Sequence, residues 1–135
     1  MAVTASRRFL SGIVPANYRV DHQEGYFREA IGHFQEMLRL THNWHAQVTG
    51  LEALASSLSR AGDVEKAVEF LGAIAAFRDE KRTPQPPFTR EATQGDLELA
   101  EKKLGRSTFE RAFESGRSKT LQQAVDQARS EDLSS

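Results

Sequence analysis

The chain has 135 residues, in which 18 lysines and arginines nearly balance 19 acidic residues, and it contains no cysteine. This length fits one compact domain, and the near-neutral charge gives no strong field that would attract nucleic acid or an anionic membrane. Without cysteine there is no disulfide, no thiolate nucleophile and no cysteine-built zinc site. No apolar run approaches the ~20 residues that cross a bilayer. We therefore expect a cytoplasmic domain that binds no nucleic acid by itself and no membrane.

The N-terminal stretch differs in composition from the rest of the chain. Residues 1–20 contain three arginines and no acidic residue, a composition that is compatible with an organelle-import segment. Pro15, however, interrupts any long amphipathic helix in this stretch. We predict that residues 1–23 form a poorly packed N-terminal segment, and a targeting role for residues 1–20 stays open.

Apolar residues recur at helical spacing between residues 25 and 41, which predicts an amphipathic helix. The segment before it is broken by Gly12 and Pro15 and offers no intact partner helix. The apolar stripe would then need cover from the N-terminal segment, from a second copy of the chain or from another protein. We therefore predict partner binding, with a homodimer through the helix at 25–40 as one form, at three residues of this stripe: Phe27, Ile31 and Phe34.

Two further helices follow through tight connections. Asn43 is a suitable N-cap for the second helix, and Gly62 supplies the left-handed conformation that ends it. Asp63 is the predicted N-cap of the third helix. Residues of the second helix that lie off its apolar face would line a binding groove, although ordinary solvated positions explain them equally well: His45, Thr49, Glu52 and Arg60.

Prolines 84, 86 and 87 predict a rigid, non-helical connector at residues 83–88. Thr89 would cap the next helix, which Gly105 ends. We expect residues 24–129 to form one helical domain and residues 130–135 to be a disordered tail. Capping-box patterns start two short helices in this half of the chain: Ser107-x-x-Glu110 and Thr120-x-x-Gln123.

An internal repeat indicates the architecture. Residues 25–31 resemble residues 62–68, since both begin with glycine and carry an apolar residue, an alanine and a β-branched residue at matching places. The offset of 37 residues between the two glycines is close to the ~34-residue period of tetratricopeptide helix pairs. The predicted fold is therefore all-α: tetratricopeptide-like antiparallel helix pairs, forming a short α-solenoid, followed by two to three shorter helices.

A longer pattern extends the repeat. Residues 51–55 and 61–73 are followed by a series in a fixed order: Arg78, Pro86-Pro87, Leu104-Gly105, Phe109, Ala112, Glu114, Gly116-Arg117, Leu121 and Ala124-Val125. In this order the chain resembles, over roughly residues 25–129, the tetratricopeptide-like repeats of large bacterial signalling ATPases and of LuxR- and SARP-type transcriptional regulators. It departs from that pattern at Phe113, where the relatives often have tryptophan. The resemblance implies a docking or sensing role only, because the chain has neither a phosphate-binding Gly-x-x-x-x-Gly-Lys loop nor a basic recognition helix.

Side chains that could carry chemistry do not form a recognisable site. His42 and His45 are three residues apart and His33 precedes them, but a helix break separates them and no further ligand completes the set. No serine lies in a Gly-x-Ser-x-Gly elbow, and the carboxylates are scattered along polar helix faces. We therefore predict no catalytic residue, no metal and no cofactor, and a chain that is not an enzyme.

These features favour a non-enzymatic helical protein–protein interaction module, a scaffold or adaptor that binds a protein partner or itself. The alternative is a regulatory C-terminal fragment of a signalling ATPase or transcription regulator. Such a fragment would act only together with the nucleotide-binding and DNA-binding domains that this chain lacks.

Overall fold

The computed structural model describes the backbone of residues 16–133 and the side chains of residues 25–133. Its helices are α2 (Ala16–Arg39), α3 (Trp44–Ala61), α4 (Val64–Lys81), α5 (Pro87–Leu104), α6 (Arg106–Arg117) and α7 (Leu121–Ser130). The predicted all-α class is confirmed, since this part of the chain contains no strand. Within the same part, no helix is both long and apolar enough to span a bilayer.

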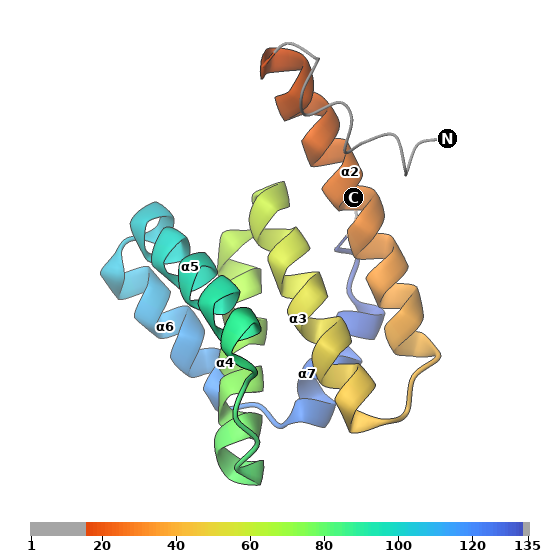
Figure 1. Cartoon of the computed structure of the whole chain (residues 1–135), viewed down its shortest axis with the longest axis vertical. Helices are drawn as coiled ribbons and strands as arrows, with labels where there is room; N and C mark the ends of the chain where they lie inside the picture. Colours follow the sequence, from red (N-terminus) through yellow and green to blue (C-terminus); the bar gives the residue numbers. More distant parts are fainter. Residues whose placement is uncertain (1–15, 134–135) are drawn as a thin grey trace.

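Neighbours in space follow the order of the chain only as far as α4 (Figure 1). Helix α2 packs on α3, and α3 packs on α4, as successive antiparallel helices. Helix α4 then packs mainly on α6 rather than on α5, and α5 lies at the edge of the bundle against α4 and α6. Helix α7 returns to contact α2, α3 and α4. The second half of the described chain is therefore not a simple continuation of consecutive helix pairs.

Several predicted helix ends are confirmed. The Asn43 side chain accepts hydrogen bonds from two backbone N–H groups in the first turn of α3. Gly62 and Gly105 adopt positive φ values of 105° and 84° at the ends of α3 and α5, a conformation that glycine adopts without steric cost. Thr120 and Gln123 form the predicted capping box, in which each side chain accepts from the backbone N–H of the other at 3.0 and 2.9 Å.

Two boundaries differ from the prediction. Helix α2 begins at Ala16 and not near residue 25. Helix α5 begins at Pro87 and not after Thr89, so the connector comprises residues 83–86 instead of 83–88. Proline is tolerated at the first helical position because an N–H there would have no partner within the helix.

Two predicted caps are wrong. Asp63 occupies the N-cap position of α4 but makes no capping hydrogen bond, and its carboxylate instead pairs with Arg28 at 3.0 Å. Helix α6 begins at Arg106, so Ser107 lies within its first turn. Glu110 pairs with Arg106 at 3.2 Å. In both cases the carboxylate pairs with an arginine in a charge-assisted contact, whereas the capping pattern predicted that it would accept a hydrogen bond from a backbone N–H group.

Helix α4 forms the centre of the core. It contacts α3, α5, α6 and α7. The apolar stripe from Val64 to Ile74 is buried, and so are Phe70, Ala73 and Phe77 on a neighbouring face. A helix that buries more than one face needs packing partners on more than one side.

The apolar stripe of α2 is covered by the chain itself. Ile31 and Leu38 have no exposed surface, and Phe27 and Phe34 are partly buried against the same core. Helices α3 and α7 supply the cover. The expectation that this stripe needs an external partner or the N-terminal segment is therefore wrong for residues 25–38.

Helices α2 and α7 hold each other's C-terminal ends. The Gln35 amide donates to two carbonyls at and just after the end of α7, at 2.9 and 2.7 Å. Arg129 of α7 donates to two carbonyls at and just after the end of α2, both at 2.7 Å.

Leu133 is 5% exposed and belongs to the core. Glu131 and Leu133 are thus held against α2 and the core, in contrast to the disordered tail expected at 130–135, whereas Ser130 and Asp132 are exposed. Residues 134–135 and the side chains of the segment 1–23 lie outside the described residues.

The crossing of α4 and α6 is a contact between two backbones. A Cβ atom placed on Gly72 would overlap the carbonyl oxygen of Phe113, and one placed on Gly116 would overlap the carbonyl oxygen of Glu69. Gly72 and Gly116 are both buried. Because the obstructing atoms belong to the backbone, no rotation of a side chain can make room. Helix α6 is therefore the helix that approaches α4 closely at Gly72.

We predict that Gly116→Ala destabilises the protein by roughly 2 kcal/mol or more, although alanine is about 1 kcal/mol the better helix former. The free energy of unfolding in urea measures this change. Gly95→Ala in α5 is the matched control, because an added Cβ there meets no atom within 4 Å. The control should stabilise the protein by up to about 1 kcal/mol. If Gly116→Ala and Gly95→Ala changed the free energy of unfolding by the same amount, the backbone contact at Gly116 would be contradicted.

Candidate functional site

A recess of about 340 Å³ lies between the N-terminal half of α3 and the connector at residues 83–86. Residues three and four apart share one face of a helix, and α3 uses such a face for one wall of the recess. The connector prolines, Pro84 and Pro86, and the first turn of α5 form the opposite side. The α3 residues of the wall are Trp44, His45, Val48, Thr49 and Glu52.

A polar network forms the base of the recess. Glu52 accepts hydrogen bonds from Arg78 and from Gln85, both at 3.0 Å. Gln85 also donates to Thr93 of α5 at 2.9 Å, and Arg78 donates to the carbonyl of Thr83 at 3.2 Å. Single side chains thus tie the connector to α3, α4 and α5, which fixes its position beside the recess.

The charges in this network neutralise each other. The side chains of Arg78 and Glu52 are 19% and 20% exposed and form an ion pair at 3.0 Å. Two further polar atoms, Nε of Arg78 and Oγ1 of Thr83, are buried without a hydrogen-bond partner among the described residues. Both atoms lie at the connector end of the recess.

The apolar part of the recess is anchored in the core. The Trp44 ring packs on Phe77 in the core, with ring centroids 5.3 Å apart, and stacks on His45 at 3.7 Å. His45 is exposed. An anchored aromatic ring beside two prolines offers a preformed surface for an apolar side chain.

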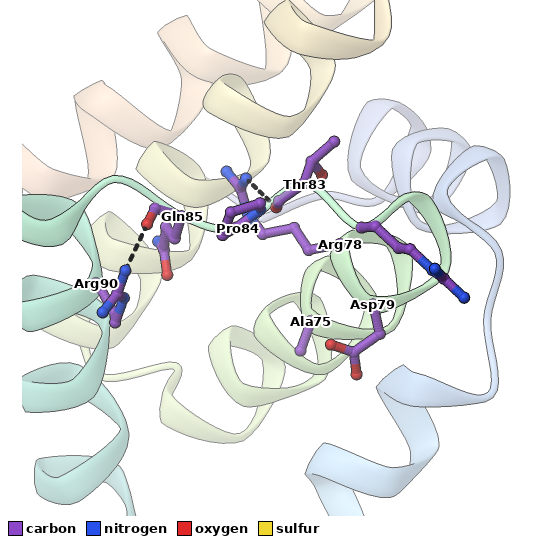
Figure 2. A pocket seen from close by; sticks show the side chains of 8 residues that line it. Ala75, Arg78, Asp79, Thr83, Pro84, Gln85 and Arg90 are labelled. Atoms are coloured by element: carbon purple, nitrogen blue, oxygen red, sulfur yellow. Dashed lines mark hydrogen bonds between the residues drawn. The ribbon is translucent and has the colours of Figure 1, made fainter.

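A second recess of about 580 Å³ shares Arg78, Thr83 and Pro84 with the first (Figure 2). Three arginines line it: Arg78, Arg82 and Arg90. Arg78 and Arg90 donate to the carbonyls of Thr83 and Gln85 at 3.2 and 3.1 Å, the two dashed lines in Figure 2. These two side chains fasten the connector, and Arg82 is exposed.

The structure brings together three of the four predicted groove residues. His45, Thr49 and Glu52 line the recess, whereas Arg60 lies two turns further along α3. The Arg60 guanidinium is 5.9 Å from the centroid of the Phe27 ring and 4.0 Å from Asp96. Arg60 therefore links α3 to α2 and α5 outside the recess.

Sequence reasoning missed the connector side of the recess. The proline pattern predicts stiffness, but it does not show against which helix the connector packs. Arg78 gave the one available signal, because a charged residue that continues the apolar stripe of α4 needs a partner where its head group emerges. That partner is Glu52, 26 residues earlier in the chain.

The predicted contact residues of α2 are not a free surface. Ile31 has no exposed area, and Phe27 and Phe34 pack against the core. Two large apolar residues near the C-terminal end of α2 are exposed. Met37 in the helix is 51% exposed, and Leu40 just after it is 74% exposed.

Three of the four histidines were considered as metal ligands, and these three lie on different elements. His33 is in α2, His42 is in the loop that follows, and His45 is in the first turn of α3, so the predicted helix break between them is confirmed. Within the part of the chain that the structure describes, no group of three or more His, Cys, Asp or Glu side chains is arranged to hold a metal ion.

One carboxyl group departs from its ordinary titration. Burial raises the pKa of Asp96 above the usual value of 3.8, and the positive charge of Arg60 partly opposes the rise. Asp96 lies in α5 beyond the recess, next to a cation that already neutralises it. Its position favours a structural effect over an acid–base role.

Comparison with known proteins gave no match: no family model, no curated protein and no solved structure is significantly similar to this chain.

We predict that Arg78 and Glu52 are energetically coupled. Arg78→Met leaves Glu52 largely buried without its charged partner and should cost roughly 1–3 kcal/mol of unfolding free energy. A double-mutant cycle with Glu52→Met should give a coupling of more than about 0.5 kcal/mol. The exposed pair Arg39–Glu36, with side chains 48% and 59% exposed, is the control, and its coupling should be below about 0.5 kcal/mol. Equal couplings would mean that the network does not hold the connector.

We also predict a pH-dependent effect of Asp96. Its raised pKa means that the folded chain holds this proton more tightly than the unfolded chain. Its contribution to stability is therefore present at low pH and is lost as the pH rises from 3.8 through the higher folded-state pKa. The change in thermal midpoint that Asp96→Asn causes should be more favourable at pH 7 than at pH 3. Asp79→Asn, at a side chain 72% exposed, is the control, and an Asp96→Asn effect that does not change with pH would contradict the argument.

Proposed function

We propose that this chain is a non-enzymatic protein–protein interaction module, a scaffold or adaptor that holds a segment of a partner protein in the recess between α3 and the connector. One observation carries this proposal. The groove residues His45, Thr49 and Glu52 line the same preformed recess as Trp44 and the connector prolines. An apolar wall with a few fixed polar groups is the usual composition of a binding site.

The chemistry of the recess indicates what kind of segment fits. Trp44, Val48, Pro84 and Pro86 offer apolar surface, and the paired charges of Glu52 and Arg78 neither attract nor repel a charged ligand strongly. An apolar side chain of an extended or helical segment suits this surface better than an anion or a metal ion. The polar rim would select by hydrogen bonds to the backbone of that segment.

The tetratricopeptide-like character of the fold belongs to this proposal. Helices α2, α3 and α4 pack as successive antiparallel neighbours, as helix-pair repeats do, and such repeats act by docking partners. The packing of α4 on α6 departs from a regular array. The regulatory alternative, a part of a signalling ATPase or transcription regulator, rests on the sequence resemblance alone.

The test is a selection of random displayed peptides on the purified chain, followed by affinity measurements with each selected peptide after synthesis. Thr49 is exposed at the recess, so Thr49→Arg would fill the recess without disturbing the core. We predict that Thr49→Arg weakens binding at least about tenfold, as the loss of a central contact does.

Ser115→Arg supplies the matched control, because Ser115 is an exposed small polar residue of α6, outside the recess, and it should leave affinity unchanged. The recess would be excluded as the binding surface if every selected peptide bound Thr49→Arg as tightly as the parent.

A further inference from the structure

The second recess, on the α4 side of the connector, carries more positive than negative charge. Its charged lining consists of three arginines and one aspartate: Arg78, Arg82, Arg90 and Asp79. Glu52 neutralises Arg78 at 3.0 Å, and an arginine of α6 offsets Asp79 at 3.3 Å. Arg82 and Arg90 remain, because neither forms an ion pair with a carboxylate among residues 25–133. The recess therefore holds two cations that no acidic side chain of the described chain neutralises.

The two unpaired arginines flank the connector. Arg82 follows the last residue of α4, and Arg90 lies in the first turn of α5. Figure 2 shows Arg90 on one side of the recess and the α4 side chain of Asp79 on the other. Both arginines are exposed. Arg90 uses one N–H for the carbonyl of Gln85, and a guanidinium has five N–H donors. A ligand that lies across the recess would therefore meet one available cation from each helix.

Arg82 also has an uncommon backbone conformation. It ends α4 with a φ of 56°, and it is the one residue other than glycine with a positive φ in the described part of the chain. A side chain is disfavoured in this conformation, and glycine is the commonest residue at such helix ends. Non-glycine residues with this conformation cluster at ligand sites. The position also allows a sharp test, because Arg82→Gly removes the cation and relieves the backbone at the same time.

We propose that this recess binds acidic side chains, and that they belong to the same partner segment whose apolar residue lies beside Trp44. The inference thus rests on the proposed function. The linings of the two recesses share three residues, so one segment can run from one recess into the other. One carboxylate at Arg82 and one at Arg90 form charge-assisted hydrogen bonds with the two guanidinium groups. The partner is therefore a segment with a large apolar residue and at least two acidic residues near it.

The charges favour carboxylates over a phosphate group. The two available cations come from different helices, so two single charges at separate points match them better than a dianion at one point. Asp79 lines the same recess, and its side chain is 72% exposed. Its carboxylate repels a dianion more strongly than a single charge. An acidic peptide therefore suits this recess better than phosphate does.

The test uses two displayed peptide libraries on the full chain, each with a central leucine. The flanking positions are Asp, Glu or Gly in one library, and Asn, Gln or Gly in the other. A selected acidic peptide should bind about tenfold more tightly than its amide counterpart. Calorimetry measures the affinity. Trp44 is the single tryptophan of the chain and lines the neighbouring recess, so its fluorescence reports whether the leucine enters that recess.

Substitutions at the two arginines separate binding from stability. Arg82→Gln and Arg82→Gly should each weaken binding of the acidic peptide about threefold to fivefold, and Arg82→Gln/Arg90→Gln should weaken it about tenfold. Only Arg82→Gly should raise the thermal midpoint, by roughly 3 °C, because only glycine relieves the positive φ. Arg111→Gln removes an exposed arginine of α6 outside both recesses and should leave the affinity unchanged.

Three results would overturn the inference. The first is an acidic library that yields no binder, or acidic peptides that bind no more tightly than their amide counterparts. The second is an acidic peptide that binds Arg82→Gln/Arg90→Gln as tightly as the parent. The third is inorganic phosphate that binds more tightly than the acidic peptide at matched ionic strength.

Thr49→Arg distinguishes failure of this inference from failure of the proposed function. If binding is lost in Thr49→Arg but is unaffected by the arginine substitutions, the proposed function stands and the acidic contact is wrong. If the arginine substitutions weaken binding but Thr49→Arg does not, the acidic contact is supported and the apolar recess is contradicted. Sensitivity to both supports one segment that occupies both recesses.

Discussion

The contact between the backbones of α4 and α6 is the constraint on which the rest of the structure depends. Gly72 and Gly116 bring the two helices closer than any residue with a Cβ atom would permit. Helix α6 therefore occupies the side of α4 that α5 would take in a regular array of consecutive helix pairs. As a result α4 has neighbours on several sides and α5 lies at the edge of the bundle. The chain then continues from α6 into α7, which contacts α2.

The exchange of polar contacts between α2 and α7 then closes the core. A buried glutamine and a largely buried arginine satisfy carbonyl groups at the ends of helices that are separated by about ninety positions in the sequence. Such long-range contacts link the first and last described helices and cover the apolar stripe of α2. Neither Gln35 nor Arg129 has a sequence neighbour that identifies its partner, so the periodicity of α2 alone wrongly predicts an uncovered face.

Local signals predicted local structure well. Asn43, Gly62, Gly105 and the Thr120 capping box act over a single turn, and the structure has each of them at the predicted place. Signals that depend on competition between partners failed, since Asp63 and Glu110 pair with arginines instead of capping a helix. The candidate site divides in the same way. The α3 side follows from helical spacing, whereas the connector side depends on the half-buried pair of Arg78 and Glu52, which no pattern within one element contains.

Two environments meet at the first turn of α5. Phe88 is exposed to solvent and Thr89 lines the recess. The orientation of this turn is fixed by the contact of Gln85 with Glu52 and Thr93, because α5 itself buries only Ala100. Leu97 and Leu104 pack against the core further along the helix. The half-buried polar network and these apolar contacts together determine which residues of α5 face solvent and which face the recess.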